Sequence, residues 1–144
     1  MFDLAQAFRD ISKGDDSAFM FMFQLWSWLQ LQDDLFDRDK PLTATQVAQG
    51  NFAFITTLAK NEFFKRHCDS ILPILLGASL AWKDSERLNT SSDAVDLVTS
   101  QVLKSEYLNV FLYVAFVKGT FEHAAKMSEA YRQYSFDVQN ESKK

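Results

Sequence analysis

The residues most able to do chemistry are three aspartates within five positions, Asp33, Asp34 and Asp37. In a helix, residues three or four positions apart share a face, so Asp33 and Asp37 lie together and Asp34 lies three residues from Asp37. Magnesium prefers oxygen ligands, takes one or two carboxylates from a protein, and fills its other positions with water or substrate phosphate. This aspartate cluster is therefore a candidate magnesium site.

The same three aspartates also fit a solvated helix end. Carboxylates at a helix C-terminus face the negative end of the helix dipole, which costs each about 0.3 to 1 kcal/mol unless a cation compensates. A bound magnesium ion would compensate, and so would Arg38 and Lys40, which follow directly in the sequence. The sequence leaves both interpretations open.

An aromatic stripe leads to the cluster. Its residues follow one another at steps of four and three, which place them on one helix face: Phe19, Phe23, Trp26, Gln30, Asp33 and Asp37. The stripe is aromatic at its start and acidic at its end. Such a stripe most simply packs against neighbouring helices, and it can also line an apolar pocket below the carboxylates.

The segment Asp33-Asp34-Leu35-Phe36-Asp37 resembles the DDxxD motif of the trans-isoprenoid (terpenoid and prenyl diphosphate) synthases. Those enzymes are all-helical, and their motif binds magnesium that holds a substrate diphosphate above an apolar pocket. The resemblance implies that the three aspartates are metal ligands and that Phe23 and Trp26 wall the pocket. It also implies that the diphosphate is bound by Lys83 and Arg87, which lie one helical turn apart.

The family's second metal motif has no full counterpart in this chain. Asp93, Asp96 and Thr99 come nearest, but Leu103 stands where the pattern has a glutamate. The wider sequence texture, carried by residues 33–41, 61–64 and 72–73, is also similar to small uncharacterised helical proteins of bacteriophages and prophages. That similarity implies a reduced relative of the synthase fold without established chemistry.

Two other groups of polar residues carry weaker signals. His67, Cys68 and Asp69 are adjacent, so in a helix they point about 100° apart and cannot converge on one ion. Glu122 and Glu129 share a helix face seven residues apart and could supply a second ligand set with the offset His123. Surface ion pairs with Lys118 and Lys126 would explain Glu122 equally well.

Composition indicates a helical protein with an aromatic core. Hydrophobic residues make up 47% of the 144 residues and phenylalanine alone numbers fourteen, whereas glycine and proline together number six. A chain of this length can bury a core without disulfides.

The single cysteine and the lack of a secretory signal predict a reducing, cytoplasmic location. A net charge of -4 without a basic stripe disfavours nucleic-acid binding.

Periodicity and capping residues predict helices over residues 2–11, 18–37, 43–59, 62–88, 92–117 and 121–134. The caps are Asp15, Asp16 or Ser17 for the second helix, Thr43 with Gln46 for the third, Asn61 for the fourth, and Ser91 or Ser92 for the fifth. A kink or break is expected at Pro73, with any break near Asp69 and Ser70. The apolar run 107–117 is predicted as a central helix rather than a strand.

These elements predict one all-α domain of six or seven helices over residues 1–138, with a polar tail at 139–144. The apolar segment 18–31 is interrupted by Gln24, Ser27 and Gln30, which indicates a buried core helix and no membrane span. The helices carry more apolar faces than a small bundle can hide. Surplus apolar surface would serve self-association or the docking of a partner.

Two functions follow. The favoured one is a binding or regulatory protein that acts through protein–protein contacts or as a homo-oligomer, because no general acid, base or nucleophile can be identified. The alternative is magnesium-dependent binding or turnover of a diphosphate-bearing substrate through Asp33, Asp34 and Asp37.

Overall fold

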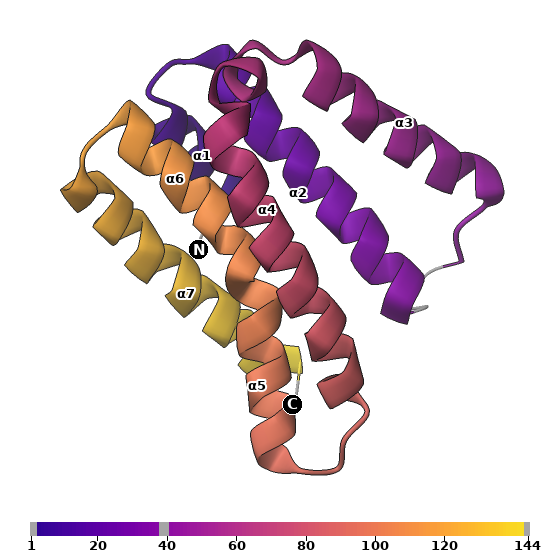
Figure 1. Cartoon of the computed structure of the whole chain (residues 1–144). Helices are drawn as coiled ribbons and strands as arrows, with labels where there is room; N and C mark the ends of the chain where they lie inside the picture. The colour runs from indigo at the N-terminus through magenta and orange to yellow at the C-terminus, as the bar shows by residue number, and fades with distance from the viewer. Residues whose placement is uncertain (1–2, 38–40, 143–144) are drawn as a thin grey trace. The chain divides into compact units, whose positions relative to one another are not determined.

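The computed structural model describes the backbone of residues 3–37 and 41–142 and the side chains of residues 3–36 and 41–134. Over these ranges the chain forms seven α-helices and one short 3-10 turn, with no strand (Figure 1). The predicted all-α class is therefore confirmed. The chain divides into two compact units, Met1–His67 and Cys68–Lys144, and the boundary falls within one long helix. The single domain over residues 1–138 stays a prediction.

The first unit contains α1 (Leu4–Ser12), α2 (Asp16–Asp37), α3 (Ala44–Lys60) and the start of α4 (Glu62–Asn89). Helix α1 ends where Lys13 and Gly14 adopt positive φ angles of 53° and 83°. Asp15 then caps α2 by accepting a hydrogen bond from the backbone N–H of Ala18 at 3.1 Å. The helix boundaries here follow from local capping, as the sequence predicted.

Helix α2 packs against both α1 and α3. The Trp28 ring stacks on Phe54 with centroids 4.5 Å apart, and its Nε1 donates to Asn51 Oδ1 at 3.1 Å. Thr43 and Gln46 form the predicted capping box at the start of α3. Gly50 lies against the Leu31 side chain so closely that a Cβ atom at position 50 would collide with it.

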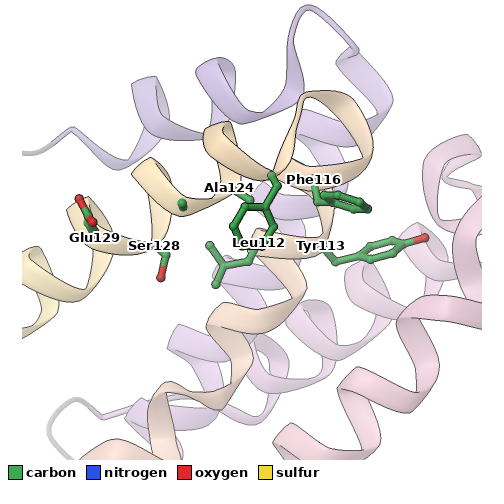
Figure 2. A pocket seen from close by; sticks show the side chains of 8 residues that line it. Leu112, Tyr113, Phe116, Ala124, Ser128 and Glu129 are labelled. Atoms are coloured by element: carbon green, nitrogen blue, oxygen red, sulfur yellow. The ribbon is translucent and has the colours of Figure 1, made fainter.

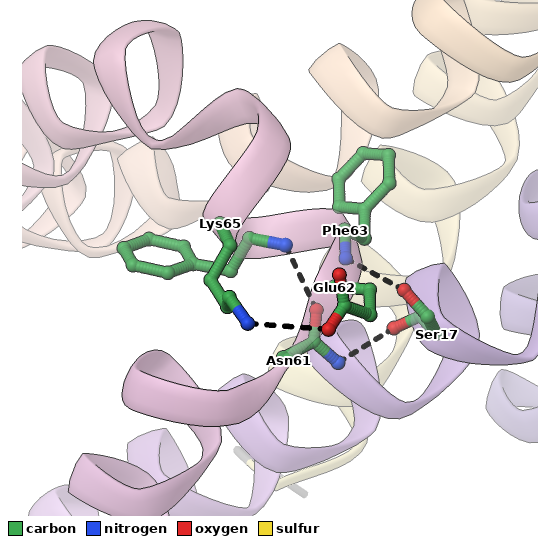
Figure 3. A network of polar contacts seen from close by, with 6 residues as sticks. Ser17, Asn61, Glu62, Phe63 and Lys65 are labelled. Carbon is green, nitrogen blue, oxygen red and sulfur yellow. Dashed lines mark hydrogen bonds and ion pairs between the residues drawn. The ribbon is translucent and has the colours of Figure 1, made fainter.

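The start of α4 is joined to α2 by a small polar network (Figure 3). Asn61 caps α4 by accepting from the backbone N–H of Phe64 at 2.8 Å, and its Nδ2 donates to the Ser17 carbonyl at 2.8 Å. The Ser17 hydroxyl accepts from the backbone N–H of Phe63 at 2.7 Å. Beside this network, Phe21 packs on Phe63 and Phe64 at centroid distances of 6.0 and 5.6 Å. Polar groups at the helix junction are thus satisfied while the rings beside them are buried.

The second unit contains the rest of α4, then α5 (Ala94–Lys104), η1 (Ser105–Tyr107), α6 (Leu108–Lys118) and α7 (Phe121–Ser142). Asp93 caps α5, because its carboxylate accepts from the backbone N–H of Val95 at 2.8 Å. The prediction of Ser91 or Ser92 as the cap is wrong. The Ser91 hydroxyl instead accepts from the backbone N–H of Asp93 and donates to Asp96.

The single helix predicted over residues 92–117 is interrupted by η1. Tyr107, at the end of this turn, is buried, and its hydroxyl lies 3.0 Å from Ser79 Oγ. Its ring meets Trp82 edge-on with centroids 5.9 Å apart. Tyr107 therefore contacts α4 where the backbone changes to 3-10 geometry, and sequence periodicity cannot show such a contact.

Helix α4 continues through Pro73, so the predicted break near Asp69 and Ser70 is wrong. A proline removes one backbone donor and crowds the preceding turn, which a long helix can accommodate when its other hydrogen bonds remain. The alternative of a kink at Pro73 stays a prediction. Helix α7 also runs to Ser142, beyond the predicted end at 134 and into the segment expected to form a tail.

Helix α6 forms the apolar centre of the second unit. Its buried residues are Leu108, Val110, Phe111, Val114 and Ala115, which confirms the prediction of a helix rather than a strand for this run. Helix α7 packs on it, with Phe111 and Tyr131 ring centroids 6.4 Å apart. Gly119 ends α6 and allows the close approach of His123, because a Cβ at position 119 would lie 2.7 Å from His123 Cδ2.

The two helical glycines Gly50 and Gly77 form a matched pair. Apart from its chain neighbours and the backbone of its own helix, no atom of the described residues lies within 4 Å of the position of a Cβ at Gly77, whereas the Leu31 side chain occupies that position at Gly50. We expect Gly77→Ala to raise the free energy of unfolding by about 0.5 to 1 kcal/mol through helix propensity. Gly50→Ala should stabilise the protein less, because Leu31 must move. Urea unfolding measures both, and an equal gain at the two positions would contradict the close packing of α2 and α3.

A second prediction concerns alkaline pH. Burial, with a smaller contribution from Tyr134, raises the pKa of Tyr131 to about 12, from about 10 in an unfolded chain. Between these values the unfolded chain loses the Tyr131 proton while the folded chain keeps it, so the free energy of unfolding falls as pH rises. Tyr131→Phe should remove a fall on the order of 2 kcal/mol between pH 10 and 12. Unfolding curves of the two proteins at pH 9, 10.5 and 12 test this, and equal slopes would contradict it.

Candidate functional site

The aspartate cluster lies at the end of α2. Asp33 and Asp34 are half-buried, and the last turn of the helix contains no basic residue. Between the aspartates, Leu35 and Phe36 are exposed. The side chain of Asp37 lies outside the described residues, as do Arg38 and Lys40. The described part of the cluster therefore places two carboxylates near the negative end of a helix.

Among the side chains described, no group of three histidine, cysteine, aspartate or glutamate residues has the arrangement of a metal site. The full aspartate cluster includes Asp37, whose side chain lies outside the described residues. The metal ligation by Asp33, Asp34 and Asp37 stays a prediction.

The two predicted pocket walls lie beside the buried face of α2 and not within it. The buried residues of this helix are Ala18, Phe21, Met22 and Leu25. Phe23 is 42% exposed and stacks on Phe19 with centroids 6.3 Å apart, and Trp26 is half-buried. This aromatic face is partly open to solvent, so it could contact a ligand.

The two predicted diphosphate ligands, Lys83 and Arg87, are exposed on α4 in the second unit. Lys83 Nζ lies 3.6 Å from a carboxylate oxygen of Asp84, and both side chains are mostly solvated. Their role beside the aspartates stays a prediction.

The described residues include an apolar groove between α6 and α7, with a volume of about 670 Å³ (Figure 2). Helix α6 contributes Leu112, Tyr113 and Phe116 to the groove. Helix α7 contributes Phe121, Ala124 and Ala125, followed at one end by Ser128 and Glu129. A groove of this size falls within the range of about 300 to 1,000 Å³ that is usual for ligand sites.

The groove is lined by both small and large side chains. Ala124, Ala125 and Ser128 keep the α7 wall low, while Phe116 and Phe121 are 54% and 76% exposed. Glu129 is the single charged residue of the lining, and it lies in the C-terminal part of the α7 wall. An apolar surface can thus bind in the groove, and the Glu129 carboxylate can pair with a cation or accept a hydrogen bond.

Sequence reasoning missed this groove, although part of its signal was visible. The run 107–117 is apolar on every side, so a helix there needs covering all round. The small residues at 124, 125 and 128 recur at helical spacing and cannot cover it fully. Of the predicted second ligand set, Glu129 lines the groove and Glu122 is exposed.

Two further apolar stripes face solvent in the second unit. Leu72, Leu76 and Leu80 of α4 are 51 to 62% exposed. The predicted stripe of Val95, Val98 and Val102 on α5 is also exposed, because the opposite side of that helix packs on α4. There Ser100 is buried, and its hydroxyl donates to the Ser85 carbonyl at 2.8 Å.

None of the helices within the described ranges is both long enough and apolar enough to cross a membrane. In comparisons with known proteins, no family model, no curated protein and no solved structure matches the chain. Its function therefore has to be inferred from the surfaces and side chains described above.

Proposed function

We propose that the chain is a binding or regulatory protein that acts through protein–protein contacts and that the groove between α6 and α7 is its docking site. The observation that carries the proposal is the groove itself: about 670 Å³ of open space with an almost wholly apolar lining. Exposed apolar surface that is concave and contiguous is typical of interaction sites, whereas scattered apolar residues are not.

The shape and charge of the groove favour one kind of occupant. Two helices form its walls, and an amphipathic helix laid between them would bury its apolar face against Phe116 and Phe121. Along α7, the wall from Phe121 to Glu129 spans about 12 Å, which is two helical turns. A lysine or arginine at one end of the partner's apolar stripe would meet Glu129. The partner is therefore proposed to be a helix with an apolar face and a basic end.

Aspartate substitutions in the groove should abolish docking without unfolding the protein. Phe116→Asp and Phe121→Asp each place a charge where the partner must be apolar, and both side chains are already exposed. Loss of a central aromatic contact typically costs 2 kcal/mol or more, which corresponds to about thirtyfold weaker capture. Phe52→Asp, on the 71% exposed Phe52 of α3, is the matched control.

The measurement is affinity capture from cells that express the protein, quantified by mass spectrometry, after melts show that each variant folds. A captured protein that is lost with both groove variants and kept with Phe52→Asp supports the proposal. Capture that is unchanged by the groove variants, or the absence of any captured protein, contradicts it.

A second candidate function is magnesium-dependent binding of a diphosphate-bearing substrate by Asp33, Asp34 and Asp37. It is supported by the position of Asp33 and Asp34 near the negative end of α2, within one helical turn of Asp37 in the sequence. A divalent cation would offset the unfavourable interaction of the carboxylates with the helix dipole. The exposed ring of Phe36 lies in the same helical turn as the carboxylates, and the exposed ring of Phe23 lies about 15 Å further back along α2.

A thermal melt with magnesium and inorganic pyrophosphate tests this second function. A ligand at a hundredfold excess over its Kd stabilises the folded state by about 2.7 kcal/mol, so the melting temperature should rise by several degrees. Asp33→Ala with Asp37→Ala should remove the rise. The control pair Asp84→Ala with Glu122→Ala removes the same charge from exposed helix positions and should keep it. No rise in the unmodified protein would contradict the magnesium site.

A further inference from the structure

Five residues of α4 form a continuous exposed face, which we call the leucine stripe: Asp69, Leu72, Leu76, Leu80 and Lys83. They follow one another at steps of three, four, four and three. Asp69 to Leu80 and Leu72 to Lys83 are thus both intervals of eleven residues. Eleven residues make three helical turns at 3.67 residues per turn, so these side chains stay on one face of a nearly straight helix. The whole stripe lies in the second unit.

The sequence of the stripe is symmetric about Leu76. Leu72 and Leu80 lie four residues to either side of it, and Asp69 and Lys83 lie seven residues to either side. The two ends therefore carry opposite charges at equal distances from the centre. A surface that meets a copy of itself about a two-fold axis must be self-complementary in this way.

We propose that the leucine stripe binds α4 of a second copy of this chain, antiparallel, with the two-fold axis at Leu76. In this arrangement Leu76 meets Leu76, and each Leu72 meets Leu80 of the second copy. Each Asp69 faces Lys83 of the second copy, so the ion pair forms twice. A parallel arrangement would place Asp69 against Asp69 and Lys83 against Lys83, which charge repulsion disfavours.

The side chains involved are accessible. Leu72, Leu76 and Leu80 are 51%, 62% and 52% exposed. Lys83 contacts Asp84 at 3.6 Å, but with side-chain exposures of 77% and 52% this solvated pair contributes little and leaves the ammonium group able to turn to another carboxylate. Asp69 is exposed next to Cys68, whose Sγ lies 3.9 Å from it.

The size of the stripe determines the strength of the contact. Asp69 to Lys83 spans about 21 Å of helix, one side chain wide. Stable complexes bury about 800 Å² on each partner, and a single helix face of this length provides less. The dimer is therefore weak and reversible, and it forms when the chain is concentrated. This surface is separate from the groove, so the proposal does not depend on the proposed docking function.

Sedimentation velocity of the full chain, at concentrations from roughly 10 to 500 µM, tests for a weak dimer whose Kd lies in this range. The unmodified protein should shift from monomer towards dimer over this range. Leu76→Asp places two charges against each other on the axis and should keep the protein monomeric. Val98→Asp, on the 56% exposed Val98 of α5, is the matched control and should dimerise. The groove variant Phe121→Asp should dimerise too, which separates this surface from the docking groove.

A charge exchange distinguishes the proposed pairing from general loss of structure. Asp69→Lys and Lys83→Asp should each weaken the dimer about tenfold, because each creates two like-charge contacts. The double variant Asp69→Lys, Lys83→Asp restores both ion pairs and should recover the affinity of the unmodified protein. A monomer at every concentration, a dimer that survives Leu76→Asp, or no recovery in the double variant would overturn the proposal.

Disulfide cross-linking tests the antiparallel direction in a Cys68→Ser background. Leu72→Cys alone should not cross-link, whereas a mixture of Leu72→Cys with Leu80→Cys should form a disulfide-linked dimer under mild oxidation. Leu76→Cys should cross-link to itself. A self-linked Leu72→Cys dimer would show a parallel contact and overturn the proposed symmetry.

Discussion

The second unit depends on the burial of a helix that is apolar on every side. A surface helix needs one covered face, but α6 needs cover all round. Val110, Phe111 and Val114 obtain it, because they are buried. The side of α6 that carries Leu112 and Phe116 is not fully covered. There α7 contributes two alanines and a serine, which are too small to fill the groove. The same requirement that makes α6 the centre of the unit therefore also produces its groove.

Surplus apolar surface is the second consequence of this composition. Helix α3 packs on α2 through Phe54, yet none of its residues is fully buried, and Phe52 and Ile55 face solvent. Exposing such side chains forgoes roughly 25 cal/mol for each Å² left uncovered, so contacts that cover them are favourable. The groove and the leucine stripe differ in how they restrict their partners. The groove is concave with one carboxylate, whereas the stripe is a convex helix face with a balanced pair of charges.

The aspartate cluster belongs to a different kind of chemistry. Two of its carboxylates lie at the end of α2 where the helix dipole is unfavourable, whereas polar residues at three helix N-termini lie where the dipole and the free N–H groups favour them. Asp15, Asp93 and Asn61 each cap a helix N-terminus. Acidic residues at an N-terminus are stabilised by the helix itself, whereas acidic residues at a C-terminus are disfavoured by about 0.3 to 1 kcal/mol each. A cation bound at this end of the helix would offset that cost.

The sequence by itself determined the all-α class and most helix ends, because capping and periodicity are interactions between residues a few positions apart. Thr43 with Gln46, and Asn61, cap the helices that the sequence assigned to them. The sequence also identified the aspartate motif. A role in diphosphate binding would depend on where Lys83 and Arg87 lie relative to the aspartates, which sequence spacing does not determine. Only the tertiary structure decided which stripes are buried: Ser100 is covered while Val98 on the other side of α5 is exposed. The interruption at η1 and the groove likewise depend on how separate helices pack, and no local pattern encodes the empty space between two side-chain surfaces.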